Sequence, residues 1–203
     1  MESRETFGEN TAAFANAALQ KWVEKMRLHC QPDRVFWCDG SLAEKEHLTR
    51  EAVAAGVLIE LNQQKLPGCY LHRSHPNDVA RVEQCTFICT MAQDDAGPTN
   101  NWAEPRGMYA KLNELLEGSM RGRTMYVVPY LMGPPGSPLT KIGVELTDSI
   151  YVVLNMRIMS RMGEVALTQL GSGDEFNHGV HSMLDLNPDR RYICHFPQDN
   201  TII

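Results

Sequence analysis

The sequence predicts an α/β protein of mixed α+β character, with a mixed β-sheet flanked by helices. Short strand-like runs alternate with amphipathic helical patterns along the whole chain, which is typical of this class. In addition, residues 122–163 join an apolar run, a Pro/Gly turn and a second apolar run without a polar break. With 203 residues and 43% hydrophobic content, the chain is large enough for one domain, residues 1–203.

The block 122–163 is the predicted core. Residues 124–131 are rich in Val, Tyr and Met and short enough for a buried strand, whereas residues 149–162 carry apolar side chains for about four helical turns. Between them, residues 133–138 contain three prolines and two glycines. Proline removes backbone donors and glycine admits unusual dihedral angles, so we expect an ordered loop here.

The N-terminal part predicts the order helix, strand, helix. Residues 1–17 are expected to be partly flexible. Residues 34–38 have the bulk of a strand, and Ser41 with Glu44 forms a capping box for a helix that ends near Gly56. The first helix presents one apolar stripe, which stops before a proline and consists of Leu19, Trp22, Val23, Met26 and Cys30.

The middle of the chain predicts short elements. Brief strands are expected at 57–61, 69–72 and 87–90, and Pro76 suits the first turn of a helix that runs to about Glu83. Residues 91–106 form the longest irregular stretch, because turn-forming residues dominate there.

The remaining elements surround the core block. Residues 107–118 predict a helix whose inward positions are Met108, Leu112, Leu115 and Leu116. Residues 176–183 are ambiguous, and residues 191–196 alternate as a strand does. Residues 201–203 resemble the first half of another strand, so the chain is expected to end within an element.

Charge and cysteine content exclude several classes of protein. A net charge of −6 argues against a general nucleic-acid or anionic-membrane surface. The apolar runs are interrupted well before the ~20 residues that a membrane-spanning helix needs. Six cysteines occur without a CxxC pair and no leader opens the chain. We therefore expect reduced thiols, a cytoplasmic location, and no nucleic-acid or membrane partner.

Two pairs of side chains leave a zinc site open as an alternative. Cys85 and Cys89 are close in sequence, and His178 and His181 could share one helical face. No second ligand pair follows the cysteines and no carboxylate accompanies the histidines. Buried thiols and hydrogen-bonded histidines are therefore the favoured interpretation.

Phosphate-binding and nucleophile motifs are absent from the sequence. Lys141 follows the Pro/Gly turn as a phosphate-loop lysine would, but the prolines cannot supply the backbone N–H groups of a phosphate cradle. Arg157 and Arg161, four residues apart, are expected to form the polar edge of the core helix.

Arg81 is the most informative charged residue. It lies near the end of the predicted short helix, where its guanidinium group could bind a carboxylate through two hydrogen bonds. A salt bridge with Asp78 or Glu83 is the simpler interpretation of the same pattern. Arg121 and Arg123, which flank a glycine before the core strand, allow the same two interpretations.

The core block closely resembles the N-terminal domain of the GTP-dependent phosphoenolpyruvate carboxykinases. The resemblance extends from about residue 18 onward. It includes VFWCDG at 35–40, DVARVE at 78–83, the bacterial-type DAGPTNNW at 95–102, and residues 175–182. The family converts oxaloacetate and GTP to phosphoenolpyruvate, carbon dioxide and GDP in gluconeogenesis and uses Mn²⁺ or Mg²⁺.

The resemblance assigns a role to one residue of this chain. Arg81 matches the family's substrate-binding arginine, on the mobile loop that holds oxaloacetate or phosphoenolpyruvate. A forked, permanently charged side chain suits such an anion. The chain departs from the family at four positions, which are Gln84 and Cys85 for the usual Ser-Lys, Pro135 for Leu, and Ile150 for Pro.

The resemblance also implies what this chain does not carry. The family's metal ligands, phosphate loop and guanine pocket follow the strand that begins at residue 201, so no catalytic, metal or cofactor residue is expected here. We therefore expect an N-terminal, substrate-side domain that is inactive alone and requires a C-terminal nucleotide-binding domain. The cut should leave apolar surface exposed and the last strand unpaired. The alternative is a stand-alone, non-catalytic binding or regulatory domain derived from the enzyme.

Overall fold

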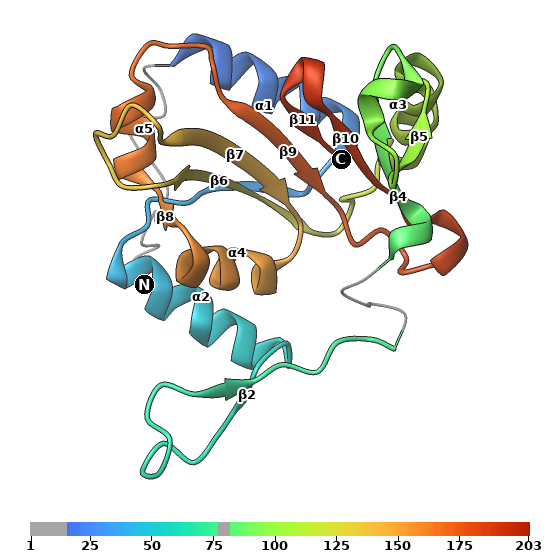
Figure 1. Ribbon diagram of the computed structural model, residues 1–203. Coiled ribbons are helices and arrows are strands. Elements are labelled where there is room, and N and C mark those ends of the chain that lie inside the picture. The colour runs from blue at the N-terminus through green and yellow to red at the C-terminus, as the bar shows by residue number, and fades with distance from the viewer. Residues whose placement is uncertain (1–15, 77–81) are drawn as a thin grey trace.

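The computed structural model describes residues 16–76 and 82–203 (Figure 1). Its helices alternate with its strands along the chain, as the sequence predicts. The α-helices of the described part are α1 (Ala17–Cys30), α2 (Leu42–Ala54), α3 (Pro105–Leu116), α4 (Ile150–Met159) and α5 (Glu164–Leu170). The strands are β1 (Arg34–Trp37), β2 (Ile59–Glu60), β3 (Tyr70–Leu71), β4 (Thr86–Cys89), β5 (Asn101–Ala103), β6 (Thr124–Met132), β7 (Lys141–Thr147), β8 (Arg161–Met162), β9 (Asn177–His181), β10 (Ile193–Phe196) and β11 (Thr201–Ile202).

One mixed sheet organises the fold. Its strand order is β1-β6-β7-β9-β11-β10-β4-β5, with β8 paired to β6. The β6–β7 and β10–β11 pairs are antiparallel, whereas β1–β6, β7–β9, β9–β11, β10–β4 and β4–β5 are parallel. Strands β2 and β3 form a separate antiparallel pair that extends from the body of the protein (Figure 1). This architecture confirms the predicted α/β class.

Helices cover the two faces of the sheet unequally. On one face, α1 and α5 pack over β6, β7 and β9 and enclose a core cluster of Leu19, Val23, Met26, Cys30, Leu116, Met120, Met125, Val127, Val144, Leu146, Leu167, Leu170, Phe176 and Val180. On the other face, α2 and α4 cover β1 and β6 (Figure 1). A third cluster joins α3 to β4 and β10. The α2–α4 face is therefore covered mainly at one end of the sheet.

Side-chain caps set the starts of the helices. Asn16 accepts a hydrogen bond from the backbone N–H of Leu19, so α1 begins at Ala17. Ser41 accepts from the N–H of Glu44, which confirms the predicted capping residue. The Glu44 carboxylate accepts from the N–H groups of Gly40 and Asp39, one and two residues before the N-cap N–H that a standard capping box uses.

The predicted helix at 149–162 is too long. Helix α4 ends at Met159 because Ser160 adopts an extended conformation. The following residues form β8, and the Gly163 N–H donates to the Pro129 carbonyl at 2.8 Å. A Cβ at Gly163 would overlap the Asp39 backbone, so the chain passes the first βα turn too closely for other residues. Strand β7 and helix α5 were not predicted.

Two further expectations change in the middle of the chain. The stretch 91–106, expected to be irregular, contains β5, which pairs parallel with β4. The indole N–H of Trp102 donates to the Thr90 carbonyl at 2.9 Å. Of the helix expected from Pro76 to Glu83, residues 77–81 lie outside the described residues, and a 3₁₀ turn at Glu83–Cys85 follows.

The expectation of an unpaired last strand is wrong. Strand β11 forms, as predicted, but it lies between β9 and β10 and pairs with both. Ile203 continues the ladder, because its N–H and carbonyl both bond to the backbone of Cys194. Its backbone groups are therefore satisfied within the chain.

Candidate functional site

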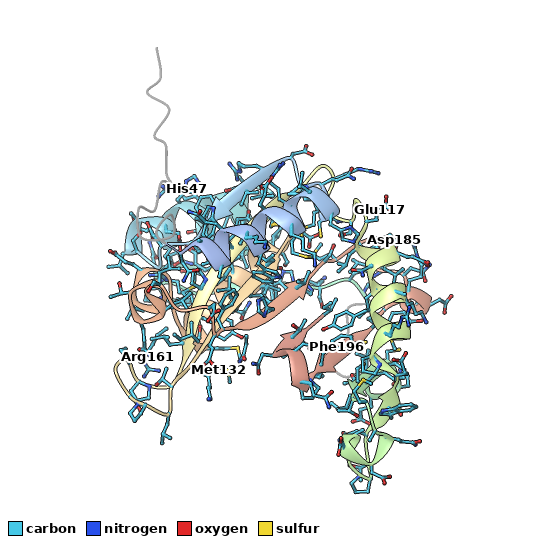
Figure 2. All side chains as sticks on the ribbon, turned by 90° about the horizontal axis from the view of Figure 1, so that it is seen from above. His47, Glu117, Met132, Arg161, Asp185 and Phe196 are labelled. Atoms are coloured by element: carbon cyan, nitrogen blue, oxygen red, sulfur yellow. The ribbon has the colours of Figure 1, made fainter. Side chains whose placement is uncertain are left out.

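A cleft of about 900 Å³ opens on the incompletely covered face of the sheet. Its walls come from segments that are far apart in sequence. These are the strand-to-helix turn before α4, the ends of β9 and β11, the 183–192 segment, the C-terminal half of α3, and residues 72–75 with Val82. In Figure 2, Asp185 of the 183–192 segment lies at the α3 end of the molecule, near Glu117, and Met132 lies on the side away from it.

Two long side chains on the cleft floor lie over glycines. The Tyr130 ring occupies the space in which a Cβ of Gly143 would lie, and the Glu145 carboxylate does the same over Gly179. Each residue is the register partner of the glycine it covers. Glycine at these positions therefore lets the two polar side chains lie flat on the sheet.

The Glu145 side chain is partly buried on the cleft floor. Burial raises its pKa to about 8. Burial also raises the pKa of Tyr130, and the negative charge of Glu145 adds to this effect. The floor of the cleft therefore favours the uncharged forms of both side chains near neutral pH.

A buried ion pair fixes the wall at the ends of β7 and β9. Arg123 Nε lies 3.1 Å from Asp148 Oδ2, and the Asp148 side chain is 0% exposed. The same carboxylate accepts hydrogen bonds from the Ser182 hydroxyl at 2.8 Å and the Met183 N–H at 2.9 Å. Arg123 also donates to the backbone carbonyls of Ser119 and Leu184. Of the two interpretations of Arg123, the structural ion pair is therefore the one observed.

The chain is anchored on both sides of residues 77–81. Before them, the His72 ring stacks on Tyr151 of α4 at a centroid distance of 3.7 Å, and His72 Nδ1 lies 2.7 Å from the Val57 carbonyl oxygen. After them, Val82 is buried and its carbonyl accepts hydrogen bonds from the Cys85 N–H and the Thr86 hydroxyl. Arg81, the predicted substrate arginine, lies outside the described residues, between these two anchors.

The other arginines singled out in the sequence, and Lys141 after the Pro/Gly turn, lie outside any anion-binding group of described residues. Arg121 donates to the Gln31 side chain at 2.8 Å. Arg157 lies 3.7 Å from the buried Glu44 carboxylate, so it is not simply at the polar edge of α4. Arg161 lies on β8 rather than on the helix. Lys141 begins β7 and is exposed.

The histidine pair does not share a helical face, because both residues lie on β9. Positions three apart on a strand point to opposite faces. The His178 ring packs against Trp22 and Phe176 on the α1 face, and His181 Nδ1 lies 2.8 Å from the Thr147 hydroxyl in the cleft. Among residues 16–76 and 82–203, no group of three His, Cys, Asp or Glu side chains could hold a metal ion.

Of the predicted zinc pair, Cys89 is buried, whereas Cys85 lies in the 3₁₀ turn and is partly exposed. Cys89 and Cys194 lie on the neighbouring strands β4 and β10, and both are buried. Burial raises the pKa of each thiol, for Cys194 to about 12.

Residues 21–203 match the family described as the phosphoenolpyruvate carboxykinase N-terminal domain. The chain belongs to this family. This domain carries the cleft residues Glu145 and Asp148 and includes the position of Arg81. None of its described helices is long and apolar enough to cross a membrane.

The relatives that match are named phosphoenolpyruvate carboxykinase [GTP]. The protein of Anaeromyxobacter sp. (strain K) is 64% identical over 188 residues, which are 93% of this chain and 32% of the relative. That of Corynebacterium kroppenstedtii is 47% identical over 96% of this chain and 33% of the relative. That of Neocallimastix frontalis is 43% identical over 96% of this chain and 34% of the relative. The chain therefore spans about a third of the length of these relatives.

The sequence predictions missed the residues of the cleft floor. Glu145 was not singled out, although it is an acidic residue inside the apolar run 142–146. Its alternation with Val144 and Leu146, which point to the opposite core, was the available signal. The pairing of Arg123 with Asp148 carried no such signal, because it depends on tertiary contacts.

Proposed function

We propose that this chain is the N-terminal, substrate-side part of a GTP-dependent phosphoenolpyruvate carboxykinase, which converts oxaloacetate and GTP to phosphoenolpyruvate, carbon dioxide and GDP. The main support is that the chain is 64% identical, over 93% of its length, to a protein named phosphoenolpyruvate carboxykinase [GTP]. The remaining two-thirds of the relatives would supply the C-terminal nucleotide-binding partner. The protein would act in the cytoplasm, where its reaction would contribute to gluconeogenesis.

Arg81 is the proposed substrate-binding residue. It follows the motif position of the family's substrate arginine, and its described neighbours Val82 and His75 both line the cleft. Oxaloacetate and phosphoenolpyruvate are anions that a guanidinium group can bind through two parallel hydrogen bonds. The cleft would thus hold the substrate while the rest of the enzyme acts on it.

The divalent metal and the nucleotide of the complete enzyme are assigned to its other part. In the described residues, the acidic and histidine side chains do not gather into a metal-binding group. At the cleft wall, Asp148 is already neutralised by Arg123 and Asp185 by Arg190. No step of the reaction is therefore assigned to a metal held by these residues.

The binding test uses calorimetric titration with oxalate and with phosphoenolpyruvate. Arg81→Ala should weaken binding by roughly 10- to 100-fold, because hydrogen bonds to charged groups contribute about 1.5–3 kcal/mol. Arg81→Lys should retain the charge effect but lose the paired hydrogen bonds. Arg106→Ala, which removes an exposed arginine at the start of α3, is the matched control and should bind as the unmodified chain does.

Equal affinity of the Arg81→Ala variant and the unmodified chain would contradict the assignment of Arg81. Activity is a separate test, made on the polypeptide that continues beyond Ile203 as the relatives do. That protein should form phosphoenolpyruvate from oxaloacetate and GTP, and the 203-residue chain should not. A continuous protein without this activity would support the non-catalytic binding domain instead.

A further inference from the structure

Glu145 is a partly buried acid without a partner in the described part of the chain. Within residues 16–76 and 82–203, it forms no hydrogen bond or ion pair, and burial is the sole cause of its raised pKa. Folding normally pairs such a group, because an unpaired buried charge is strongly unfavourable. The strand next to Glu145 also accommodates its carboxylate, since a side chain at position 179 would displace it.

The surroundings of Glu145 in the cleft are those of an interface. Met132, Met159 and Ile202 line the same cleft and are 60%, 84% and 43% exposed. Exposed apolar side chains interspersed with polar ones are typical of a surface that another part of a protein covers. On the cleft face, no described helix covers β9 and β11 as α4 covers β6 (Figure 1).

The position of β11 indicates which part of the complete protein covers the cleft around Glu145. Ile202 of β11 is the register partner of Gly179, and Gly179 is the register partner of Glu145, so β11 runs two strands away from β7 at the level of this carboxylate. The relatives continue for about another two-thirds of their length. Their next residues therefore leave the sheet beside the exposed apolar rim.

We propose that Glu145 receives a lysine or arginine side chain from the C-terminal part of the complete protein, and that this ion pair anchors the two parts across the cleft. This inference rests on the proposed function only because it requires that the complete protein has a C-terminal part. A cation is the fitting partner, since burial alone raises the pKa of this carboxylate and no described basic side chain lowers it. The substrate is excluded as this partner because it is itself an anion.

Infrared difference spectroscopy between the unmodified protein and Glu145→Gln tests the proposal directly. A protonated carboxylic acid has a carbonyl stretch that a carboxylate lacks. At pH 6.5, this band should be present in the 203-residue chain, where Glu145 is neutral, and absent from the complete protein, where a cation holds it ionised. Glu46→Gln, which removes an exposed acid of α2, is the control and should change neither spectrum in this region.

The thermal stability of the same variants gives a second readout. At pH 8.5, above the raised pKa, Glu145 is ionised and unpaired in the 203-residue chain, so Glu145→Gln should raise the melting temperature by roughly 3 °C. In the complete protein, the same change should lower it by a similar amount, because it removes one partner of a buried pair. The sign of the effect should therefore differ between the two proteins.

Several outcomes overturn the proposal. A protonated Glu145 in the complete protein, or the same sign of the stability change in both proteins, shows that no cation reaches it. An ionised Glu145 in the 203-residue chain shows that its partner belongs to this part of the protein. A complete protein that lacks carboxykinase activity but ionises Glu145 would contradict the proposed function and leave this inference standing.

Discussion

The two faces of the central sheet differ in how completely this chain covers them. On the α1–α5 face, side chains such as Leu146 and Val127 are fully buried in a continuous apolar cluster. On the α2–α4 face, the cover ends beyond β6, and the strands β7, β9 and β11 present Glu145, His181 and Ile202 to a cleft. The first face stabilises the domain, whereas the second holds the residues available for binding.

This difference extends to the way polar groups are handled. Asp148, at the edge of the cleft, has three partners within the chain. Glu145, only three residues earlier, has none among the described residues. The structural carboxylate of Asp148 thus has its hydrogen-bond partners within the domain. The unpaired carboxylate of Glu145 marks a surface that another part of the protein can bind.

The largest expected effect comes from the closed face. Leu146→Ala should lower the free energy of unfolding by about 4 kcal/mol, because it leaves a cavity in a fully buried cluster. Ile202→Ala, on the open face, should cost no more than about 1 kcal/mol, since that side chain is already 43% exposed. Urea unfolding monitored by far-ultraviolet circular dichroism measures both values. Equal losses would remove the distinction between the faces.

The next effect concerns the ion pair at the cleft wall. Arg123→Met should destabilise the protein by about 3 kcal/mol, because the Asp148 side chain remains buried without its cation. Urea unfolding of Arg123→Met, Asp148→Asn and the double variant measures the coupling. The double variant should be more stable than the sum of the single losses predicts. Strict additivity would mean that the two side chains do not act as a pair.

A smaller effect tests the position of Glu145. Gly179→Ala should destabilise the protein by about 1 kcal/mol, because the new Cβ overlaps the end of the Glu145 side chain, which must shift. In the Glu145→Ala background, the same substitution should cost less, since the space over the strand is then empty. Thermal unfolding of the four proteins provides the comparison. A cost that is unchanged by Glu145→Ala would show that backbone conformation, rather than the carboxylate, requires glycine at this position.

Sequence patterns predicted the closed face better than the open one. The apolar stripe of α1 and the run of β6 specify their own burial, so both elements were correctly placed. Strand β7 was missed because it is interrupted by Gly143 and Glu145, whose presence makes sense only beside Tyr130 and Gly179. The helix predicted through Met162 stopped early for a tertiary reason, which is the close approach of Gly163 to the first βα turn.

The candidate site was predictable only through resemblance. Arg81 was assigned a role by its motif, and its assignment stays a proposal because it lies outside the described residues. The cleft itself brings together residues that are far apart in sequence, and no local sequence pattern predicts their proximity. The pairing of β11 with both neighbours likewise depends on the sheet order, which the sequence of three terminal residues does not reveal.

Methionine oxidation tests most directly whether the open face is covered in the complete protein. Met132 and Met159 line the cleft, Met91 lies elsewhere and is 76% exposed, and Met120 and Met125 are fully buried references. Peroxide treatment followed by peptide mass spectrometry should oxidise Met132, Met159 and Met91 in the 203-residue chain. In the complete protein, Met132 and Met159 should be protected while Met91 still reacts. Equal oxidation of Met132 and Met159 in the two proteins would contradict the account.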